Sequence, residues 1–306
     1  MNLSRTSPSR GSKSPQVTGF YDDDTGSVQY LVADPETREA ALIDTVLSFD
    51  PKSAATNSDS VEDILGFAKA EGLDITWILD THPHADHLMA SSFLKKRLGK
   101  PNATGAKILE IAELWRDFYH MPDAFDPASD FDHLFQDGDS FQIGSLPVKV
   151  MLSPGHTLGS ITYVVGDDAA FVHDTFMQPD VGTARADFPG GTAADLYGSL
   201  QNILALPDDT RLFIGHDYGS KYRKTPTWES TVAEQRRHNI HVGGGTNKAA
   251  YIDLREARDN SLALPDRMLH VLQMNLRAGA LLNRPGFTGD CLVLLKRLYR
   301  VCSCLH

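Results

Sequence analysis

Cysteine is almost absent from the body of this sequence. Only three of the 306 residues are cysteines, and Cys291, Cys302 and Cys304 all fall within the last sixteen positions. A body without disulfides suits a reducing compartment, so we expect a cytoplasmic protein, or a protein of the mitochondrial matrix if the source is eukaryotic. A metal site at residues 302–306 is unfavourable, because a chain end is poorly preorganised for ligands.

The sequence also lacks long apolar runs and an excess of positive charge. No stretch approaches the roughly 18 apolar residues of a membrane helix, so we expect no membrane partner. Lys and Arg number 29 against 40 Asp and Glu, which gives a net charge of −11. Nucleic-acid binding depends on clustered basic residues, so we expect no nucleic-acid partner. The oligomeric state stays open, with a homodimer among the options.

Composition divides the chain into a body and two unusual ends. The body has the apolar and charged fractions of an ordinary globular protein. The N-terminal segment is rich in serine, basic and free of acids, as transit peptides are, but its prolines disfavour an amphipathic helix. We expect a disordered tail over residues 1–16, one domain over residues 17–280, and an apolar, basic and dispensable tail over residues 281–306.

Three histidines and an aspartate follow a short apolar run, residues 75–79, that predicts a buried strand. His82, His84, Asp86 and His87 would be costly to bury without a partner. A divalent metal is such a partner, because neutral imidazole and carboxylate are its usual ligands. In an extended loop, residues two apart point the same way, so His82 and His84 can face one site. The alternative is a surface loop that is rich in histidine.

Further candidate ligands follow later apolar runs. His156, Asp174 and His216 each come after a run typical of a strand, and a shared metal centre requires ligands from several strand ends. Predicted strands and helices alternate in two runs, which favours two sheets with helices outside. The other histidines are expected to be loop, packing or helix-end residues: His120, His133, His173, His238 and His241.

At these residues the sequence resembles the metallo-β-lactamase superfamily, whose signature is His-x-His-x-Asp-His after a buried strand. The later elements recur in the same order at residues 153–159, 171–175 and 213–219. The resemblance covers roughly residues 17–279. It implies an α/β fold, the metallo-β-lactamase-like αβ/βα four-layer sandwich.

The resemblance implies two alternative metal centres. In the persulfide dioxygenase branch, one Fe(II) is bound by His82, His156 and Asp174 as a facial triad with open positions. In the zinc hydrolases of the superfamily, His82, His84 and His156 would hold one Zn(II), and Asp86, His87 and His216 would hold a second, with Asp174 bridging. In the dioxygenase, the surrounding residues His84, Asp86, His87 and His216 would instead orient the ligands and hold water.

Local sequence resembles the dioxygenase branch more than the glyoxalase II branch. Ala85 and Asp217 match the dioxygenase pattern, as do residues 183–188 and the element at residues 275–279. The resemblance therefore implies oxidation of glutathione persulfide with O2 to sulfite and glutathione. A dizinc, glyoxalase II-like hydrolase of glutathione thioesters is the alternative, and an inactive scaffold with a metal-stabilised fold is the third option.

The loop after Asp174 is expected to bind substrate. The Arg185 guanidinium would hold a glutathione carboxylate in a two-pronged clamp, with Asp187 and Phe188 beside it. The alternative for Arg185 is a structural ion pair with Asp187 or Asp180. Tyr218 would donate its hydroxyl to the same ligand, or would pack as an ordinary tyrosine.

Overall fold

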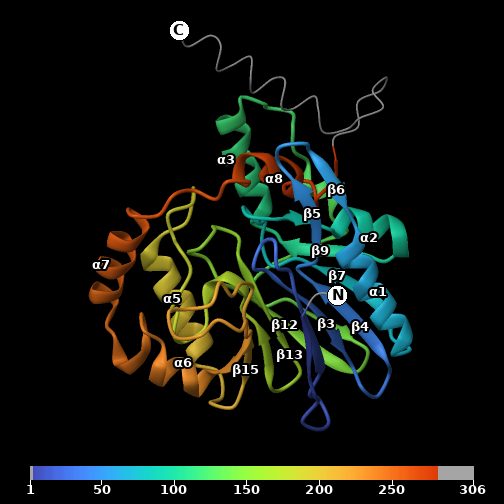
Figure 1. Ribbon diagram of the computed structural model, residues 1–306, viewed down its shortest axis with the longest axis horizontal. Helices are drawn as coiled ribbons and strands as arrows, with labels where there is room; N and C mark the ends of the chain where they lie inside the picture. The colour runs from blue at the N-terminus through green and yellow to red at the C-terminus, as the bar shows by residue number, and fades with distance from the viewer. Residues whose placement is uncertain (1–2, 282–306) are drawn as a thin grey trace.

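Strands and helices alternate in two successive runs in the computed structural model, which describes residues 3–281 (Figure 1). The first run comprises β1 (Ser4–Ser7), β2 (Gln16–Tyr21), β3 (Val28–Ala33), β4 (Glu39–Ile43), β5 (Val46–Asp50), β6 (Ala55–Asn57), α1 (Asp59–Ala70), β7 (Asp74–Leu79), β8 (Leu88–Met89), α2 (Ser91–Leu98), β9 (Asn102–Gly105), α3 (Ile108–Tyr119), α4 (Pro127–Asp130) and β10 (His133–Phe135). The second run comprises β11 (Ser140–Ile143), β12 (Leu146–Leu152), β13 (Ile161–Val165), β14 (Ala169–Phe171), η1 (His173–Thr175), α5 (Ala193–Leu204), β15 (Arg211–Phe213), β16 (Glu229–Thr231), α6 (Val232–His238), η2 (Gly243–Gly245), α7 (Lys248–Asp259) and α8 (Met268–Asn275).

The two runs form two sheets that pack against each other. The first sheet has the strand order β1-β2-β3-β4-β7-β9-β10, and the second has the order β11-β12-β13-β14-β15-β16. Helices α1 and α2 lie beyond the first sheet, and α5, α6 and α7 lie beyond the second (Figure 1). This layering confirms the predicted four-layer αβ/βα sandwich.

Alternating apolar side chains explain why the sheets stack. Val32 and Ile43 of the first sheet share one buried cluster with Val150, Tyr163 and Phe171 of the second. Because successive strand residues point to opposite faces, the other face of the first sheet is free to pack on helices. Each fully buried aliphatic side chain contributes about 1.5–3 kcal/mol.

Helix α1 covers the outer face of the first sheet. Val61, Ile64 and Ala68 recur at helical spacing and pack in one cluster with Leu42 and Ile78. Among the described helices, none combines the length and apolar character needed to cross a bilayer.

The predicted disordered tail over residues 1–16 is wrong for the residues that the structure describes. Strand β1 pairs antiparallel with β2, with Ser4 opposite Phe20. The buried guanidinium of Arg211 donates to the carbonyl oxygens of Pro8 and Pro15, which fastens the segment between the two strands. The predicted C-terminal tail, residues 281–306, lies outside the described residues except for residue 281.

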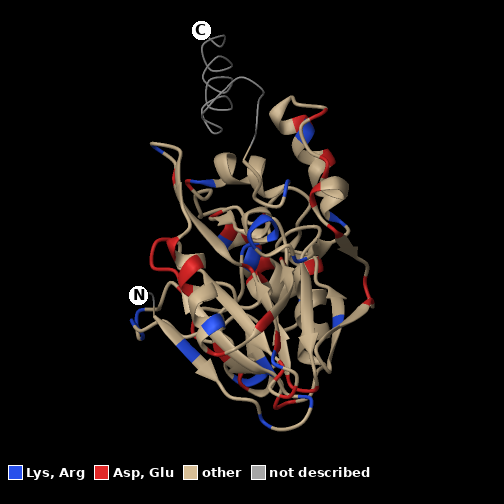
Figure 2. Ribbon diagram, turned by 90° about the vertical axis from the view of Figure 1, so that its right-hand side faces the viewer, with Lys and Arg blue, Asp and Glu red and all other residues tan. Residues whose placement is uncertain are grey.

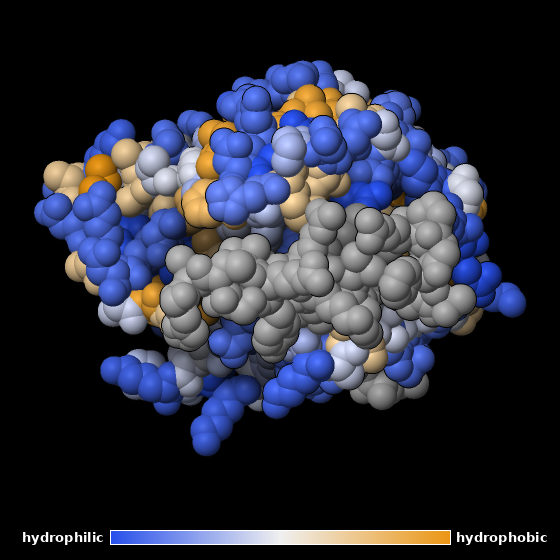
Figure 3. Space-filling view, turned by 90° about the horizontal axis from the view of Figure 1, so that it is seen from above, coloured by the Kyte–Doolittle hydropathy of each residue, from blue (hydrophilic) through white to orange (hydrophobic). Residues whose placement is uncertain are grey.

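Charged residues are dispersed over the described surface. Figure 2 shows Lys and Arg interspersed with Asp and Glu along the ribbon. Seen from above in Figure 3, most of the visible described surface is hydrophilic, and the hydrophobic residues form small separate groups.

Candidate metal centre and adjoining pocket

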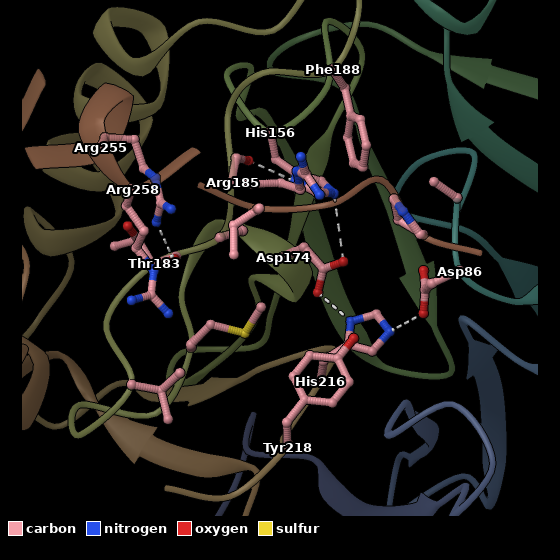
Figure 4. Close-up of a pocket in the computed structure, with 16 residues that line it drawn as sticks. Asp86, His156, Asp174, Thr183, Arg185, Phe188, His216, Tyr218, Arg255 and Arg258 are labelled. Carbon is pink, nitrogen blue, oxygen red and sulfur yellow. Dashed lines mark hydrogen bonds and ion pairs between the residues drawn. The ribbon is translucent and has the colours of Figure 1, made fainter. Parts of the chain in front are cut away.

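Strand ends bring the seven candidate metal ligands to one region. His82, His84, Asp86 and His87 lie in the loop between β7 and β8. The remaining three follow strands of the second sheet: His156 after β12, Asp174 after β14 and His216 after β15. Strands β14 and β15 are parallel neighbours, so their carboxyl ends deliver Asp174 and His216 to the same edge. Figure 4 shows Asp86, His156, Asp174 and His216 together at one pocket.

Two imidazoles face one oxygen of Asp174. The Nε2 atoms of His82 and His156 lie 3.7 Å and 3.6 Å from Asp174 Oδ2. The opposite nitrogen of His156, Nδ1, donates to the Arg185 carbonyl at 2.9 Å, which leaves the lone pair on Nε2. His82 Nδ1 lies 3.0 Å from the Thr81 hydroxyl. Both rings therefore present Nε2 to the carboxylate, as metal-binding histidines held by a second contact do.

The chemistry of these donors fits a bound cation. His82 Nε2 is buried and has no hydrogen-bond partner among the described residues, an arrangement that is costly unless an ion binds there. Burial lowers the pKa of His82 and of His156 and so favours the neutral imidazole that coordinates a metal. Ligands at about 2.1 Å from an ion lie roughly 3–3.5 Å apart. The distances from His82 and His156 to Asp174 would need to shorten only slightly for all three side chains to bind one ion. The described residues also contain three groups of His and Asp side chains whose ligand atoms all lie within 4.8 Å of one another, and His156 belongs to none of these groups.

His216 bridges two carboxylates. Its Nδ1 lies 2.6 Å from Asp174 Oδ1 and its Nε2 lies 2.6 Å from Asp86 Oδ2. Burial opposes a charged ring, but the two carboxylates outweigh it and hold the pKa of His216 well above its ordinary value. Burial would likewise raise the pKa of Asp174 and Asp86, yet the His216 charge helps to hold both well below their usual range. This arrangement leaves Asp174 Oδ2 to face His82 and His156.

His84 and His87 each have one occupied and one free nitrogen. His84 Nε2 lies 3.1 Å from Asp44 Oδ1, and His87 Nδ1 lies 3.0 Å from the Ser27 hydroxyl. His84 Nδ1 and His87 Nε2 are buried without a hydrogen-bond partner among the described residues. In the two-zinc arrangement that the resemblance implies, the free nitrogen of His84 would face the first ion and that of His87 the second.

Asp44 is a site residue that the sequence reasoning missed. Its Oδ1 accepts from the Thr81 amide at 2.8 Å and faces His84, while its Oδ2 lies 3.3 Å from His173 Nε2. Burial raises the pKa of Asp44, and the nearby His173 charge opposes that rise. A signal was present, because Asp44 directly follows strand β4, which pairs in parallel with β7.

His173 packs against the cluster. Residues 173–175 form a 3-10 turn, and His173 has a φ of 38°. The ring lies against Asp44 and 3.4 Å from Asp174 Oδ1. A Cβ on Gly215 would lie 2.2 Å from this ring, so glycine is needed beside His216 for His173 to fit.

Asn275 fastens the loop that carries the histidine motif. Its Nδ2 donates to the carbonyl oxygens of His84 and His87, each at 2.7 Å. Its Oδ1 accepts from the Met89 amide at 2.9 Å. The element at residues 275–279 was singled out by resemblance alone, and the structure gives Asn275 a physical role in shaping the loop.

A pocket of about 270 Å³ opens beside these groups (Figure 4). Three of the four predicted substrate residues line it, namely Arg185, Phe188 and Tyr218, whereas Asp187 does not. The full lining consists of Ala85, Asp86, His156, Asp174, Met177, Val181, Thr183, Ala184, Arg185, Phe188, His216, Tyr218, Arg255, Arg258, Leu262 and Pro265.

Most of the Arg185 guanidinium is already occupied. Its Nε and Nη2 donate to the two oxygens of Asp187 at 2.6 Å and 2.7 Å, and its Nη1 donates to the Ala263 carbonyl at 2.6 Å. This is the ion pair weighed as the alternative for Arg185. The two-pronged face that a clamp on a substrate carboxylate would use is therefore filled by Asp187.

Phe188 and Tyr218 differ in exposure. Phe188 is buried, with its ring edge-on to His156 at a centroid distance of 5.2 Å and below the Arg185 guanidinium. Tyr218 is 65% exposed and its ring stacks on His216 at 5.6 Å. Phe188 thus forms the wall behind His156, and Tyr218 stands at the pocket mouth.

His241 is buried and neutral, so the prediction of a helix-end cation is wrong for this residue. Its Nδ1 accepts from the Thr183 amide at 2.9 Å. Burial, followed by the charges of Arg255 and Arg258, lowers the pKa of His241 to about 4. The other histidines expected outside the site do lie in exposed positions: His120, His133 and His238.

Comparisons with known proteins agree with this geometry. Residues 22–216 match the family described as "Metallo-beta-lactamase superfamily". The chain is 52% identical over 269 residues to "Beta-lactamase hydrolase-like protein" of Xylella fastidiosa, covering 88% of this chain but only 62% of that protein. It is 32% identical over 212 residues to human "Persulfide dioxygenase ETHE1, mitochondrial", with 69% of each chain covered. The crystal structure of ETHE1 from Myxococcus xanthus is similar with a TM-score of 0.68 and 29% identity, covering 86% of this chain and 98% of that one.

Proposed function

We propose that this chain, which belongs to the metallo-beta-lactamase superfamily, is a mononuclear Fe(II) persulfide dioxygenase that oxidises glutathione persulfide with O2 to sulfite and glutathione. The observation that carries the proposal is the convergence of His82 Nε2 and His156 Nε2 on Asp174 Oδ2. Two imidazoles and one carboxylate form the facial triad of non-haem Fe(II) oxygenases. The likeness to human and Myxococcus proteins named for this activity supports it.

Fe(II) bound by this triad would supply open coordination positions where a persulfide sulfur and O2 meet. His82 and His156 are kept neutral by burial, and their second nitrogens are fixed by Thr81 and Arg185. Asp174 is kept ionised and is oriented by His216 through its other oxygen. The chain therefore prepares the charge state and the direction of each donor before an ion binds.

The pocket lining adds a path for a substrate of mixed character. Met177, Val181, Leu262 and Pro265 give it apolar walls that reduce water access beside the triad. Phe188 closes the wall behind His156. A small persulfide can lie along these walls with its terminal sulfur toward Asp174 and its polar end toward the mouth.

One experiment separates this function from its alternative. Protein purified without air is analysed for metal content, and O2 uptake is then measured with glutathione persulfide. We expect one iron per chain and O2 consumption that depends on the persulfide. Two zinc ions per chain, with hydrolysis of S-lactoylglutathione and no O2 uptake, would overturn the proposal.

A dizinc hydrolase of glutathione thioesters is the second candidate, and two observations favour it. His84 Nδ1 and His87 Nε2 are buried without hydrogen-bond partners among the described residues, as metal ligands would be. Asp86, Asp174 and His216, which this candidate would place around the second ion, have ligand atoms that all lie within 4.8 Å of one another.

A further inference from the structure

One arginine of the pocket has no acidic partner among residues 3–281. Arg185, Arg255 and Arg258 all line it. Arg185 is paired with Asp187, and the buried Arg255 is paired with Asp259 at 2.6 Å. Within the part of the chain that the structure describes, the exposed Arg258 guanidinium makes no hydrogen bond or ion pair. Its five donors are therefore available to a ligand.

The backbone that carries Arg258 is held firmly in place. Arg255 Nη1, three residues earlier in α7, donates to the Thr183 carbonyl at 2.8 Å. Asp259 Oδ2, one residue later, accepts from the Ala186 amide at 2.9 Å. Residues three apart on a helix lie side by side, so Arg258 flanks the face of α7 that is fastened to the loop after Asp174. A fixed backbone lets a long side chain bind a ligand at lower entropic cost.

Charge and polarity vary from one side of the pocket to the other. Asp86, Asp174 and His216 stand on one side in Figure 4, and Arg258 stands on the opposite side. His216 contacts both carboxylates. Apolar side chains complete the lining between these groups. A complementary ligand is anionic at one end, apolar along its middle, and able to place a reactive group at the triad.

We propose that Arg258 binds a carboxylate of the peptide thiol that carries the persulfide, and that it determines specificity for such substrates. This inference rests on the proposed function for the identity of the ligand. A guanidinium with free donors matches a carboxylate in a two-pronged contact. Arg185 has its corresponding face filled by Asp187, so Arg258 supplies the free cation that had been expected at position 185.

The test measures binding apart from turnover. Glutathione and glutathione diethyl ester, in which both carboxylates are blocked, are titrated calorimetrically without air into the iron-loaded protein. We expect the unaltered protein to prefer glutathione over the diester by about tenfold or more, since a charge-assisted contact typically has that effect. Arg258→Ala should abolish most of this preference, and Arg258→Lys should keep part of it.

Lys248→Ala is the matched control, because it removes an exposed cation from the same helix that does not line the pocket. In steady-state assays, Arg258→Ala should raise KM for glutathione persulfide about tenfold with kcat and iron content unchanged. If Arg258→Ala and the unaltered protein prefer glutathione over the diester equally, the inference about Arg258 is overturned. This holds even if O2 is consumed and the proposed function stands. If instead no O2 is consumed but the preference depends on Arg258, the inference stands and the proposed function fails.

Discussion

Two buried polar regions differ in whether their polar atoms have hydrogen-bond partners. One is the metal cluster, and the other is the set of contacts between α7 and the loop at residues 183–187. In the cluster, His82 Nε2, His84 Nδ1 and His87 Nε2 have no hydrogen-bond partner among residues 3–281. In the second region, the Arg255 and Asp259 side chains pair with each other and also bind the backbone of the loop. Buried polar groups normally have hydrogen-bond partners. The free nitrogens of the cluster therefore indicate a centre that is prepared for an ion. The Arg255–Asp259 pair and its contacts with the loop, called the support below, need no ion.

The two regions are physically joined through the same short loop. The Arg185 carbonyl fixes the His156 ring, and the next residue, Ala186, is held by Asp259. A change in α7 can therefore disturb the position of His156 without touching the metal ligands. The predictions below test whether the cluster depends on the ion and the support on its internal pairs.

The largest effect is expected at the triad. His82→Ala, His156→Ala and Asp174→Ala should each abolish iron binding and reduce kcat/KM by about a thousandfold or more, because each would remove one of the three proposed ligands. His216→Ala should leave iron bound, since both nitrogens of His216 contact carboxylates. Metal analysis and O2 uptake measure both effects, with the exposed His238→Ala as control. Complete loss of metal in His216→Ala would point to a coupled two-metal site.

The next effect tests the support. Arg255→Met should lower the free energy of unfolding by about 3–5 kcal/mol, because it leaves Asp259 buried without its partner. The pair Arg255→Met with Asp259→Leu should recover part of this loss, although the Ala186 amide then lacks an acceptor. Urea denaturation measures both, and the exposed neighbour Arg258→Ala should change stability by about 0.5 kcal/mol or less. If Arg255→Met and Arg258→Ala lower the free energy of unfolding equally, the buried Arg255–Asp259 pair stabilises the fold no more than an exposed arginine does.

Asn275→Ala should have an intermediate effect on both regions. It removes two donors to the His84 and His87 carbonyls and one acceptor for the Met89 amide. Leaving such buried groups unsatisfied costs about 1–3 kcal/mol for each, and water entry reduces the sum to about 2–4 kcal/mol. Iron should also dissociate faster, because the loop that carries His82 loses its anchor. Chelator competition measures that rate, and an unchanged rate would confine the role of Asn275 to folding.

The sequence was most informative where a short motif and a strand end coincide. His82, His84 and His87 follow a buried apolar run, and the loop after such a strand has little freedom to send them elsewhere. The same holds for Asp174 and His216. For these residues local pattern alone indicated the site, and the resemblance added the order of the later elements.

The sequence was least informative where a role depends on distant contacts. An Arg255–Asp259 pair at i and i+4 is typical of an exposed helix face, and only the contact with residues 183–186 makes it a buried support. Strand β1 was missed for a similar reason. Its Ser-rich sequence has three exposed residues out of four, so its order comes from pairing with β2 rather than from apolar alternation.

The smallest effect concerns pH and His241. Burial, aided by Arg255 and Arg258, lowers the pKa of this ring to about 4 in the folded protein, against an ordinary value of about 6.5 in the unfolded chain. Between about pH 4 and pH 6.5, the His241 ring is therefore mostly protonated in the unfolded chain but mostly neutral in the folded protein. The stability that neutral His241 preserves is therefore complete above about pH 6.5 and is lost as the pH falls toward 4.

His241→Gln should remove this pH dependence while keeping an acceptor for the Thr183 amide. Between pH 7.5 and pH 5, the loss of stability in the unaltered protein should exceed that of the variant by about 2 kcal/mol. Urea denaturation of both proteins at the two pH values measures the difference, in which the titration of the metal cluster cancels because both proteins share it. Parallel losses in the two proteins would mean that His241 is protonated without penalty in the folded state, and that the loop at residues 183–187 tolerates a charge beneath it.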